Sequence, residues 1–293
     1  MDFNAIQRLT DEEFNRFAKL IHTESGIFMK PTKITLLSNR LRKRLQVLKI
    51  NTFAQYYDYV VSLTDKTREL EELLDVVSTN ETYFFRNERH FNAFSGKCLP
   101  DLAARKKDRK LTIWSAGCST GEEPYTISIC INESLHLFPG WKIEILATDI
   151  ANSVLDFARE GRYSGRRIEK VSAQFLQKYF TRIQDGPSDK DTVYEVKDSL
   201  RRHITFKPLN LFKDPFPTGV DIIFCRNVMI YFDREHQTTL VNNFYRSISK
   251  ENGYLFIGHS ETLHSISEDF AYIKLLDAPV YVPVQRLNEF KRN

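Results

Sequence analysis

The sequence lacks several features that would assign it to particular classes. It has no run of 18 apolar residues, so we expect no transmembrane helix. Its first residues, MDFNAIQRLTDEEF, lack the basic and apolar segments of a secretory signal, and we expect a cytoplasmic protein. Its seven histidines are scattered without an H-E-x-x-H motif, and none of its four cysteines forms a C-x-x-C pair. We therefore expect buried thiols and no metal site.

The composition indicates a packed globular chain. The 293 residues are 42% hydrophobic and 27% charged, which suits one large domain or a domain with a smaller partner. A net charge of +4 says little by itself, but its distribution is uneven. Residues 26–50 hold seven basic side chains and no acidic one (Lys30, Lys33, Arg40, Arg42, Lys43, Arg44 and Lys49). Such a basic segment favours an acidic partner.

The first eighty residues have the periodicity of helices. Thr10 and Glu13 form a capping box at the start of one helix, and Gly26 is suited to end it. A second helix follows, with apolar residues at spacings of three and four from Ile34 to Leu48, and two more patterns cover residues 52–63 and 65–78. Lys33, Arg40 and Arg44 form a stripe beside the apolar face of the second helix.

Strands and helices alternate from residue 111 onward. Strands are predicted at 111–117, 142–150, 203–211, 220–228 and 253–261, with helices at 124–137, 153–160 and 234–250. This order predicts a mainly parallel sheet covered on both faces. Two apolar stretches near the end, FAYIKLL and APVYVPV, predict an antiparallel hairpin at one edge. Between 161 and 202 the alternation is interrupted by a helix at 172–179 and an inserted hairpin.

A glycine turn, AGCSTGEEPY (116–125), follows the first strand and opens a helix. Such a turn is typical of nucleotide sites, although many occur without a ligand. The sequence matches neither G-x-G-x-x-G nor a Walker A motif. Glu122 and Glu123 lie at the helix N-terminus, where a carboxylate about 4 Å from a phosphate costs roughly 1–4 kcal/mol. A cationic nucleoside, S-adenosylmethionine, fits better than a dinucleotide or ATP, while helix capping explains one of the two glutamates.

Polar residues follow other strands at the same edge. Asp149 ends the second strand, where an acid can bind ribose hydroxyls or act as the N-cap of the next helix. Asn210 follows another strand. Arg226 and Asn227 end a buried strand abruptly, which favours a site over a solvated face, and Tyr231 lies just beyond as a site residue or a packed aromatic.

Six motifs, in order, make the sequence similar to the chemotaxis-receptor glutamate methyltransferases, the CheR family. They are NETYFFRNERHF (80–91), WSAGCSTGEEPYTISI (114–129), ATDI (147–150), NLF (210–212), FCRNVMIYFD (224–233) and GHSE (258–261). The resemblance implies a class I S-adenosylmethionine-dependent methyltransferase fold, a Rossmann-like and mainly parallel seven-stranded sheet. It also implies an all-α N-terminal domain (1–79), a linker with the first cofactor motif (80–110) and a catalytic domain (111–293) with an inserted β-subdomain at about 172–203.

The resemblance also implies a reaction and its residues. The expected products are glutamyl methyl esters on chemoreceptor cytoplasmic helices and S-adenosylhomocysteine. Cofactor contacts are expected at Asn80, Thr82, Arg86, Glu123, Asp149, Asn210, Leu211, Arg226 and Asn227. Arg86 and Tyr231 match positions at the methyl-transfer site, and Arg86 either steers the acceptor carboxylate or holds the cofactor's carboxylate. A glutamate is ionised at pH 7, so the transfer needs no general base.

Two expectations concern recognition. Lys33, Arg40 and Arg44 are predicted to dock the acidic receptor helices, the alternative being a solvated helix face. The turn IQDGPSDKD is longer than the glycine-rich turn of members that bind a receptor pentapeptide, so we expect recognition without that tether.

Two other functions share features with this prediction. A nucleic-acid methyltransferase uses the same cofactor, but CRNVMIY stands where adenine-specific enzymes have N/D-P-P-Y/F, and we expect no nucleic-acid partner. A non-catalytic interaction module would keep the fold without an intact set of site residues. Direct membrane insertion is not expected.

Overall fold

The computed structural model describes residues 8–63, 67–186, 188 and 191–290. Four helices come first: α1 (Asp11–Ser25), α2 (Ile34–Leu48), α3 (Phe53–Ser62) and α4 (Thr67–Val77). Local sequence sets the limits of α1. Thr10 and Glu13 form the predicted reciprocal capping box, and Gly26 ends the helix with a left-handed φ of 71°. The prediction of an N-terminal helical region is confirmed.

The central sheet has seven strands in the order β6-β2-β1-β7-β8-β10-β9. They are β1 (Lys110–Ala116), β2 (Lys142–Asp149), β6 (Ile204–Pro208), β7 (Ile222–Cys225), β8 (Tyr254–Ile257), β9 (Phe270–Leu275) and β10 (Ala278–Pro283). The first five are parallel, and β9 and β10 form the predicted antiparallel hairpin at one edge. Because β1 pairs with β2 on one side and β7 on the other, its carboxyl end is a topological switch point, where such folds bind ligands.

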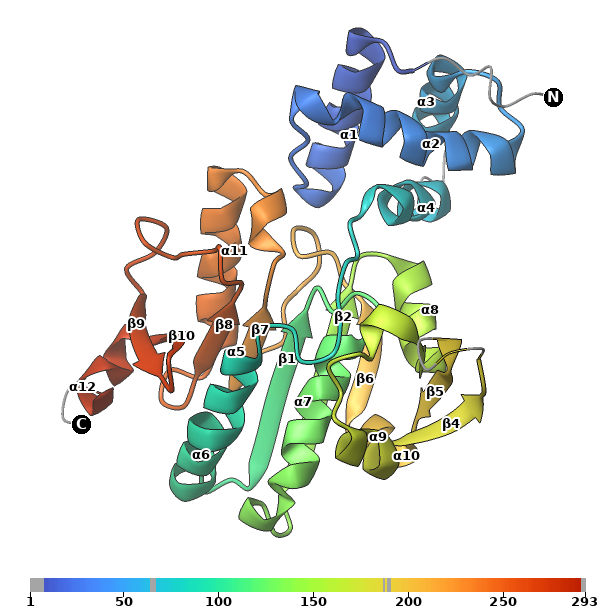
Figure 1. Cartoon of the computed structure of the whole chain (residues 1–293). Coiled ribbons are helices and arrows are strands. Elements are labelled where there is room, and N and C mark those ends of the chain that lie inside the picture. The colour runs from blue at the N-terminus through green and yellow to red at the C-terminus, as the bar shows by residue number, and fades with distance from the viewer. Residues whose placement is uncertain (1–7, 64–66, 187, 189–190, 291–293) are drawn as a thin grey trace.

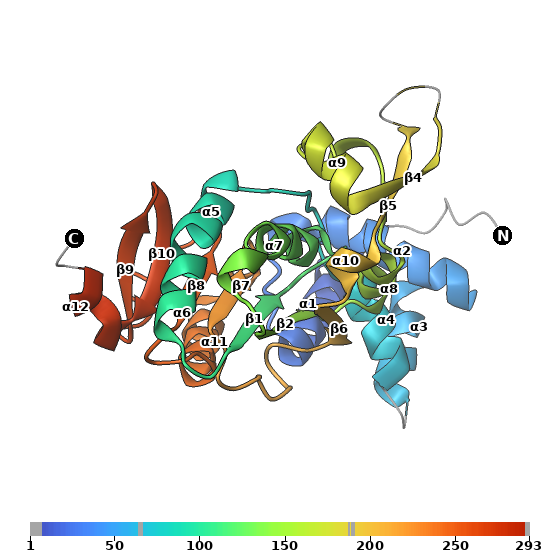
Figure 2. The ribbon, with the colours of Figure 1, turned by 90° about the horizontal axis from the view of Figure 1, so that it is seen from below.

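Helices cover both faces of the sheet, as the sequence predicts (Figure 2). On one face lie α5 (Glu88–Ala93), a π-helix (Phe94–Cys98), α6 (Leu99–Arg105), α7 (Glu122–Glu133) and α8 (Asn152–Glu160). On the other lies α11 (Arg234–Ser247), whose Leu240 and Phe244 pack against Trp114 and Leu255. All four cysteines are buried, as expected. Within the described ranges, no helix combines the length and apolar character needed to cross a membrane.

A second, smaller sheet forms the inserted subdomain beside β6 (Figure 1). It has the order β3-β5-β4, from β3 (Arg162–Tyr163), β4 (Phe180–Gln184) and β5 (Val193–Val196), and it is accompanied by α9 (Ala173–Tyr179) and α10 (Asp198–Arg201). The predicted helix and hairpin are present, and β3 adds a strand that precedes the predicted limit of 172. The turn IQDGPSDKD, on which tether-independent recognition was predicted, lies partly outside the described residues.

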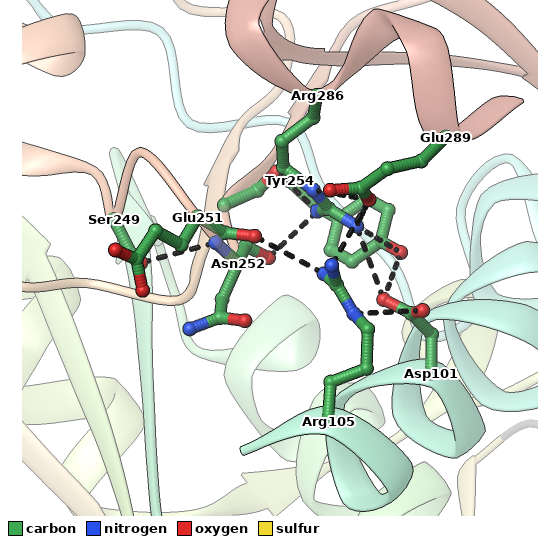
Figure 3. Close-up of polar contacts among 9 residues, drawn as sticks. Asp101, Arg105, Ser249, Glu251, Asn252, Tyr254, Arg286 and Glu289 are labelled. Atoms are coloured by element: carbon green, nitrogen blue, oxygen red, sulfur yellow. Dashed lines mark hydrogen bonds and ion pairs between the residues drawn. The ribbon is translucent and has the colours of Figure 1, made fainter.

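A polar cluster fixes the C-terminal end of the chain to the sheet (Figure 3). Arg286, with a side chain only 1% exposed, donates to the carbonyls of Asn252 and Gly253 at 2.8 and 3.0 Å. It also bonds to the Asp101 carboxylate, which accepts from the Tyr254 hydroxyl at 2.6 Å. Arg286 also donates to Glu289 of the helix α12 (Leu287–Phe290) at 3.0 Å. The cluster therefore joins α6, β8 and α12, and none of these residues lines the cavity described next.

Candidate functional site

A cavity of about 750 Å³ is lined by residues of the helical region and of the loops at the carboxyl ends of the parallel strands. Figure 1 shows the helical region above these strand ends. The size of the cavity suits a small-molecule site. The structure places all the predicted cofactor and catalytic residues in its lining: Asn80, Thr82, Arg86, Glu123, Asp149, Asn210, Leu211, Arg226, Asn227 and Tyr231. Lys33 and Arg40 also line it, whereas Arg44 does not. Segments almost 200 residues apart in sequence thus meet at the topological switch point.

The glycine turn forms the floor of this cavity. Gly117 and Gly121 have φ of 80° and 93°, which L side chains rarely adopt. A Cβ at Gly117 would lie 2.5 Å from Val228, and one at Gly121 would lie 2.7 Å from the Cβ of Ala158. Gly117 therefore allows the loop after β7 to approach the turn, and Gly121 allows α8 to do so. The helix α7 begins directly afterwards at Glu122, two residues before the predicted start at 124.

Glu123 faces the cavity and is held on two sides. Its carboxylate accepts from the Ser115 hydroxyl at 2.7 Å and from the Arg226 guanidinium at 3.1 Å. The Arg226 side chain is only 2% exposed and also donates to the carbonyl of Arg86. Burial lowers the pKa of Arg226 from its ordinary value, against the field of Glu123. The abrupt charge after β7 is thus buried, so Arg226 does not belong to a solvated face, and its role as a site residue stays a prediction.

Glu122 has a structural role at the N-terminus of α7. It is fully buried, pairs with Arg167 and accepts from the Thr120 hydroxyl at 2.7 Å. Both glutamates are therefore neutralised by arginines. The electrostatic case against a phosphate ligand assumed free carboxylates, and the structure corrects that assumption.

Asp149 is a buried carboxylate at the end of β2. It accepts from the backbone N–H groups of Ser119 at 2.8 Å and Ala151 at 3.1 Å, and burial raises its pKa. The alternative N-cap role is wrong, because the N-cap residue of α8 is Ala151 and the Ser153 N–H donates to Asp75 at 2.7 Å. A carboxylate can accept about four hydrogen bonds, so Asp149 retains acceptors for a pair of hydroxyls.

Asn227 is strained and only partly satisfied. It adopts a left-handed φ of 60°, and its side-chain Oδ1 is buried with no partner among the residues that the structure describes. A buried acceptor of this kind needs a donor. A nucleoside bound in the cavity would offer hydroxyl and amino donors, so the lining fits such a ligand.

Glu261 positions the loop that carries these residues, and the sequence analysis gave it no role. Its carboxylate accepts backbone N–H groups from Asn227 at 2.9 Å, Ile230 at 3.2 Å and Gly258. It therefore fixes the turn after β7, from which Asn227 and Tyr231 enter the cavity. The motif GHSE was visible in the sequence, but only the fold brings it beside FCRNVMIY.

The segment before α5 places Arg86 at the cavity. The Arg86 guanidinium donates to the Glu81 carbonyl at 2.7 Å, and its neighbours Phe85 and Asn87 have φ of 57° and 58°. The Phe85 N–H donates to Thr126 of α7 at 3.2 Å, which anchors the segment. The two left-handed residues that flank Arg86 set its direction, a feature that the sequence does not show.

Asn210 joins the two regions of the chain. Its side-chain amide donates to the Glu24 carbonyl at 2.7 Å and accepts from the Phe212 N–H at 3.0 Å. The side chain thus holds α1 against the loop after β6. The Asn210 backbone is also engaged, because its N–H donates to the Asp214 carboxylate at 2.7 Å and its carbonyl accepts from the Asp214 N–H at 3.0 Å. A cofactor contact at Asn210 stays a prediction.

The predicted basic docking stripe is partly wrong. Arg44 is buried, with two hydrogen bonds to Glu69 at 2.7 and 3.1 Å and one to Glu72 at 2.9 Å. It belongs to the helical core because α4 packs over that side of α2. Arg40 donates to the Val77 carbonyl and to Thr79 at 2.9 Å, and burial lowers its pKa. Only Lys33 of the three is freely exposed.

One group of possible metal ligands appears in the fold although the sequence predicts none. His22, Asp233 and His236 bring one ligand atom each within 4.8 Å of one another. His22 and Asp233 are 211 positions apart, so no local motif could have shown this group.

Comparisons with known proteins assign the class. Residues 80–278 match the family model for the S-adenosylmethionine-binding domain of CheR methyltransferases, and residues 12–78 match the model for their all-alpha domain. The site and fold are therefore those of an S-adenosylmethionine-dependent methyltransferase. The two models together cover most of the chain, and the protein belongs to the CheR methyltransferase family.

Relatives of similar length support this family assignment. A chemotaxis protein methyltransferase of Borreliella burgdorferi is 40% identical, covering 92% of this chain and 95% of its own. One of Escherichia coli is 36% identical, covering 89% and 88%. These relatives support methylation in chemotaxis. A solved magnesium protoporphyrin IX methyltransferase from Synechocystis is 12% identical, covers 75% of this chain and 96% of its own, and has a TM-score of 0.34, too low to carry weight here.

Proposed function

We propose that this protein transfers the methyl group of S-adenosylmethionine to glutamate side chains on cytoplasmic helices of chemoreceptors. The products are glutamyl methyl esters and S-adenosylhomocysteine, formed in the cytoplasm. The observation that carries the proposal is the composite cavity. The strand ends supply Asp149 and Asn227, the start of α7 supplies Glu123, and the helical region supplies exposed lysines at the same opening.

The cavity residues divide into two roles. Asp149, Glu123 and Asn227 offer acceptors to hydroxyl, ammonium and amino donors of the cofactor, and Arg226 offers charge near its carboxylate. Asn80, Thr82 and Leu211 complete the wall. Bound S-adenosylmethionine supplies an activated methyl group. No metal takes part in this proposal.

The acceptor needs orientation rather than deprotonation. A free glutamate has a pKa of about 4.3 and is ionised at pH 7, so no protein base has to remove a proton. Arg86 and Tyr231 are proposed to position the acceptor carboxylate and to replace its water shell. Arg86 is suited to this because, among the described residues, its guanidinium donates one hydrogen bond, to the Glu81 carbonyl, and its other N–H donors remain for a ligand.

Receptor docking is assigned to the exposed lysines beside the cavity. Lys30 and Lys33 are exposed at its opening, next to Phe28, which is 49% exposed. Acidic receptor helices are complementary to this pair. Recognition without a pentapeptide tether is part of the proposal, and a titration with such a peptide that saturates would contradict that part.

A methyl-transfer assay tests the proposed reaction. Radiolabelled S-adenosylmethionine is incubated with receptor-containing membranes and with DNA, and the protein-bound label is then treated with base. We expect base-labile label on the receptor, because carboxyl methyl esters hydrolyse. Base-stable label on DNA would indicate the nucleic-acid methyltransferase, and no label with properly folded protein would indicate a non-catalytic module.

Arg86→Ala tests the assigned role within that reaction. We expect turnover to fall at least about tenfold, the scale of a lost positioning contact. Arg89→Ala is the matched control, since Arg89 is exposed on α5 and is absent from the cavity lining. Near-normal turnover in a folded Arg86→Ala protein would refute the role.

A further inference from the structure

A group of three side chains joins the helical region to the catalytic domain at α1 and α11. His22 lies on α1, Asp233 is the N-cap residue of α11, and His236 lies one turn further along α11. His22 Nε2 is 2.6 Å from one oxygen of Asp233, and His236 Nδ1 is 2.8 Å from the other. The two imidazole rings are 4.5 Å apart between centroids. None of these residues lines the methyl-transfer cavity.

We propose that His22, Asp233 and His236 bind one divalent transition-metal ion of the zinc type. Two imidazoles and one carboxylate are a ligand set that zinc uses when it keeps a position open for water. The side chains are 33%, 30% and 25% exposed, so an ion can reach them and a water can complete the coordination. All three ligand atoms already lie within 4.8 Å of one another.

The geometry requires only a small adjustment. Ligands at about 2.0–2.2 Å from zinc stand roughly 3.0–3.5 Å apart in a tetrahedral site. The distances of 2.6 and 2.8 Å, which join the two imidazoles to different oxygens of Asp233, would therefore widen by less than about 1 Å. The widest separation among the three ligand atoms is at most 4.8 Å and would narrow by no more than about 2 Å.

Two cationic side chains near this position are held by other partners. Lys213 is paired with Glu24, and Arg234 donates to the backbone carbonyl of Ser265. The rings beside the group are apolar: Phe212 lies 4.8 Å from His236, and Phe28 lies 6.2 Å from His22. Asp233 thus supplies the local negative charge.

Local capping explains only part of the group. Asp233 accepts from the His236 N–H at 2.9 Å, as an N-cap residue does for the third residue of its helix. That arrangement needs neither His22 nor the second oxygen of Asp233. The three-sided group exists because α1 crosses the start of α11, where the Phe28 N–H also donates to the Tyr231 carbonyl at 2.8 Å.

A bound ion would clamp one wall of the cavity. Asp233 stands two residues after Tyr231, and His22 stands two residues before Glu24, whose carbonyl binds Asn210. Coordination of one ion by His22 of α1 and by Asp233 and His236 at the start of α11 would link the helical region to the catalytic domain. The metal site itself does not depend on methyl transfer.

Zinc titration of the untagged full-length protein tests the proposal. The protein is stripped with a chelator, exchanged into metal-free buffer at neutral pH, and titrated with Zn²⁺ against a chromogenic competitor. We expect one ion per chain, and an affinity at least about tenfold lower in His22→Ala and in His236→Ala. Co²⁺ in place of Zn²⁺ should give a visible absorption band that both variants lose.

Two controls separate the site from general effects. His264→Ala removes an exposed histidine outside the group, and Lys213→Met removes another contact between the two regions without removing a ligand. Both should keep the wild-type zinc affinity. Circular dichroism shows whether each variant is folded, and the two histidine variants lie on different helices. No stoichiometric binding, or binding that survives in folded His22→Ala and His236→Ala proteins, would overturn the proposal.

Discussion

Replacing Glu123 by glutamine probes the buried ion pair at the centre of the cavity. Glutamine keeps the shape of the side chain and can still accept from the Ser115 hydroxyl. It removes the anion that stands 3.1 Å from Arg226. Because the Arg226 side chain is only 2% exposed, its charge would remain in a largely dry environment.

The magnitude follows from the burial of the pair. Removing one partner of a buried ion pair destabilises a protein by about 3–5 kcal/mol. Glu123 is 12% exposed, and Arg226 keeps its hydrogen bond to the Arg86 carbonyl, so the lower end applies. We expect Glu123→Gln to lower the free energy of unfolding by about 3 kcal/mol. At about 2–4 °C per kcal/mol, the melting temperature would fall by about 6–12 °C.

A double-mutant cycle measures the coupling. Urea unfolding is followed for Glu123→Gln, Arg226→Met and the double variant at neutral pH. The double variant removes both charges, so its loss should be smaller than the sum of the single losses by at least about 1 kcal/mol. Glu133→Gln is the control on the same helix. Its partner Lys178 is 52% exposed, so a loss of no more than about 1 kcal/mol is expected.

Calorimetric binding of S-adenosylmethionine adds a second readout. If Glu123 also faces the cation of the cofactor, the folded Glu123→Gln protein should bind it more weakly than wild type at a temperature where both are fully folded. A stability change below about 1 kcal/mol, or strictly additive losses in the cycle, would show that the pair is not the buried unit inferred here.

Three further predictions concern other parts of the fold. Burial lowers the pKa of His90 to about 3, against an ordinary value of 6.5. The unfolded chain therefore binds the extra proton first, and stability should fall as pH drops from 6.5 towards 3; His90→Phe should flatten this dependence in urea unfolding at pH 7.5 and 5. Gly121→Ala should disrupt the turn and weaken cofactor binding by at least about tenfold in calorimetry, because its Cβ would lie 2.7 Å from Ala158. Arg44→Met should lower the melting temperature by leaving Glu69 buried without its cation, while Glu69→Gln/Arg44→Met should recover part of the loss.

The local sequence predicts much of the architecture because its signals act over short distances. The capping box at Thr10, the left-handed glycine at 26 and the apolar periodicity of α2 set helix limits within a few residues. The strand β1 has the predicted length of seven residues, whereas the other four parallel strands are shorter than predicted. Residues 226–228 leave the sheet after β7 to line the cavity, and residues 258–261 leave it after β8, where the Glu261 carboxylate accepts from the Asn227 N–H.

The sequence does not predict which charged side chains pair between distant elements. The periodicity of α2 alone predicts a surface position for Arg44, whereas α4 places Glu69 and Glu72 against it. The sequence around Glu122 likewise does not show that Arg167 forms an ion pair with its carboxylate. In both cases the burial of the side chain depends on which other element packs against its helix. The periodicity of one helix does not show which element that is.

The sequence by itself determined the helical region, the parallel sheet, the family and the segments that form the cofactor cavity. Turn residues, hydrophobic periodicity and motifs are each defined by residues that lie close together in the chain, so they can be recognised without the fold. Only the tertiary structure decided how charges are paired and which side chains remain unsatisfied. It joined Glu261 to the loop of Asn227, Arg226 to Glu123, and His22 to Asp233 across 211 positions. Those contacts depend on the packing of whole elements, since hydrogen bonds and ion pairs act over a few ångströms in space, whatever the separation along the chain.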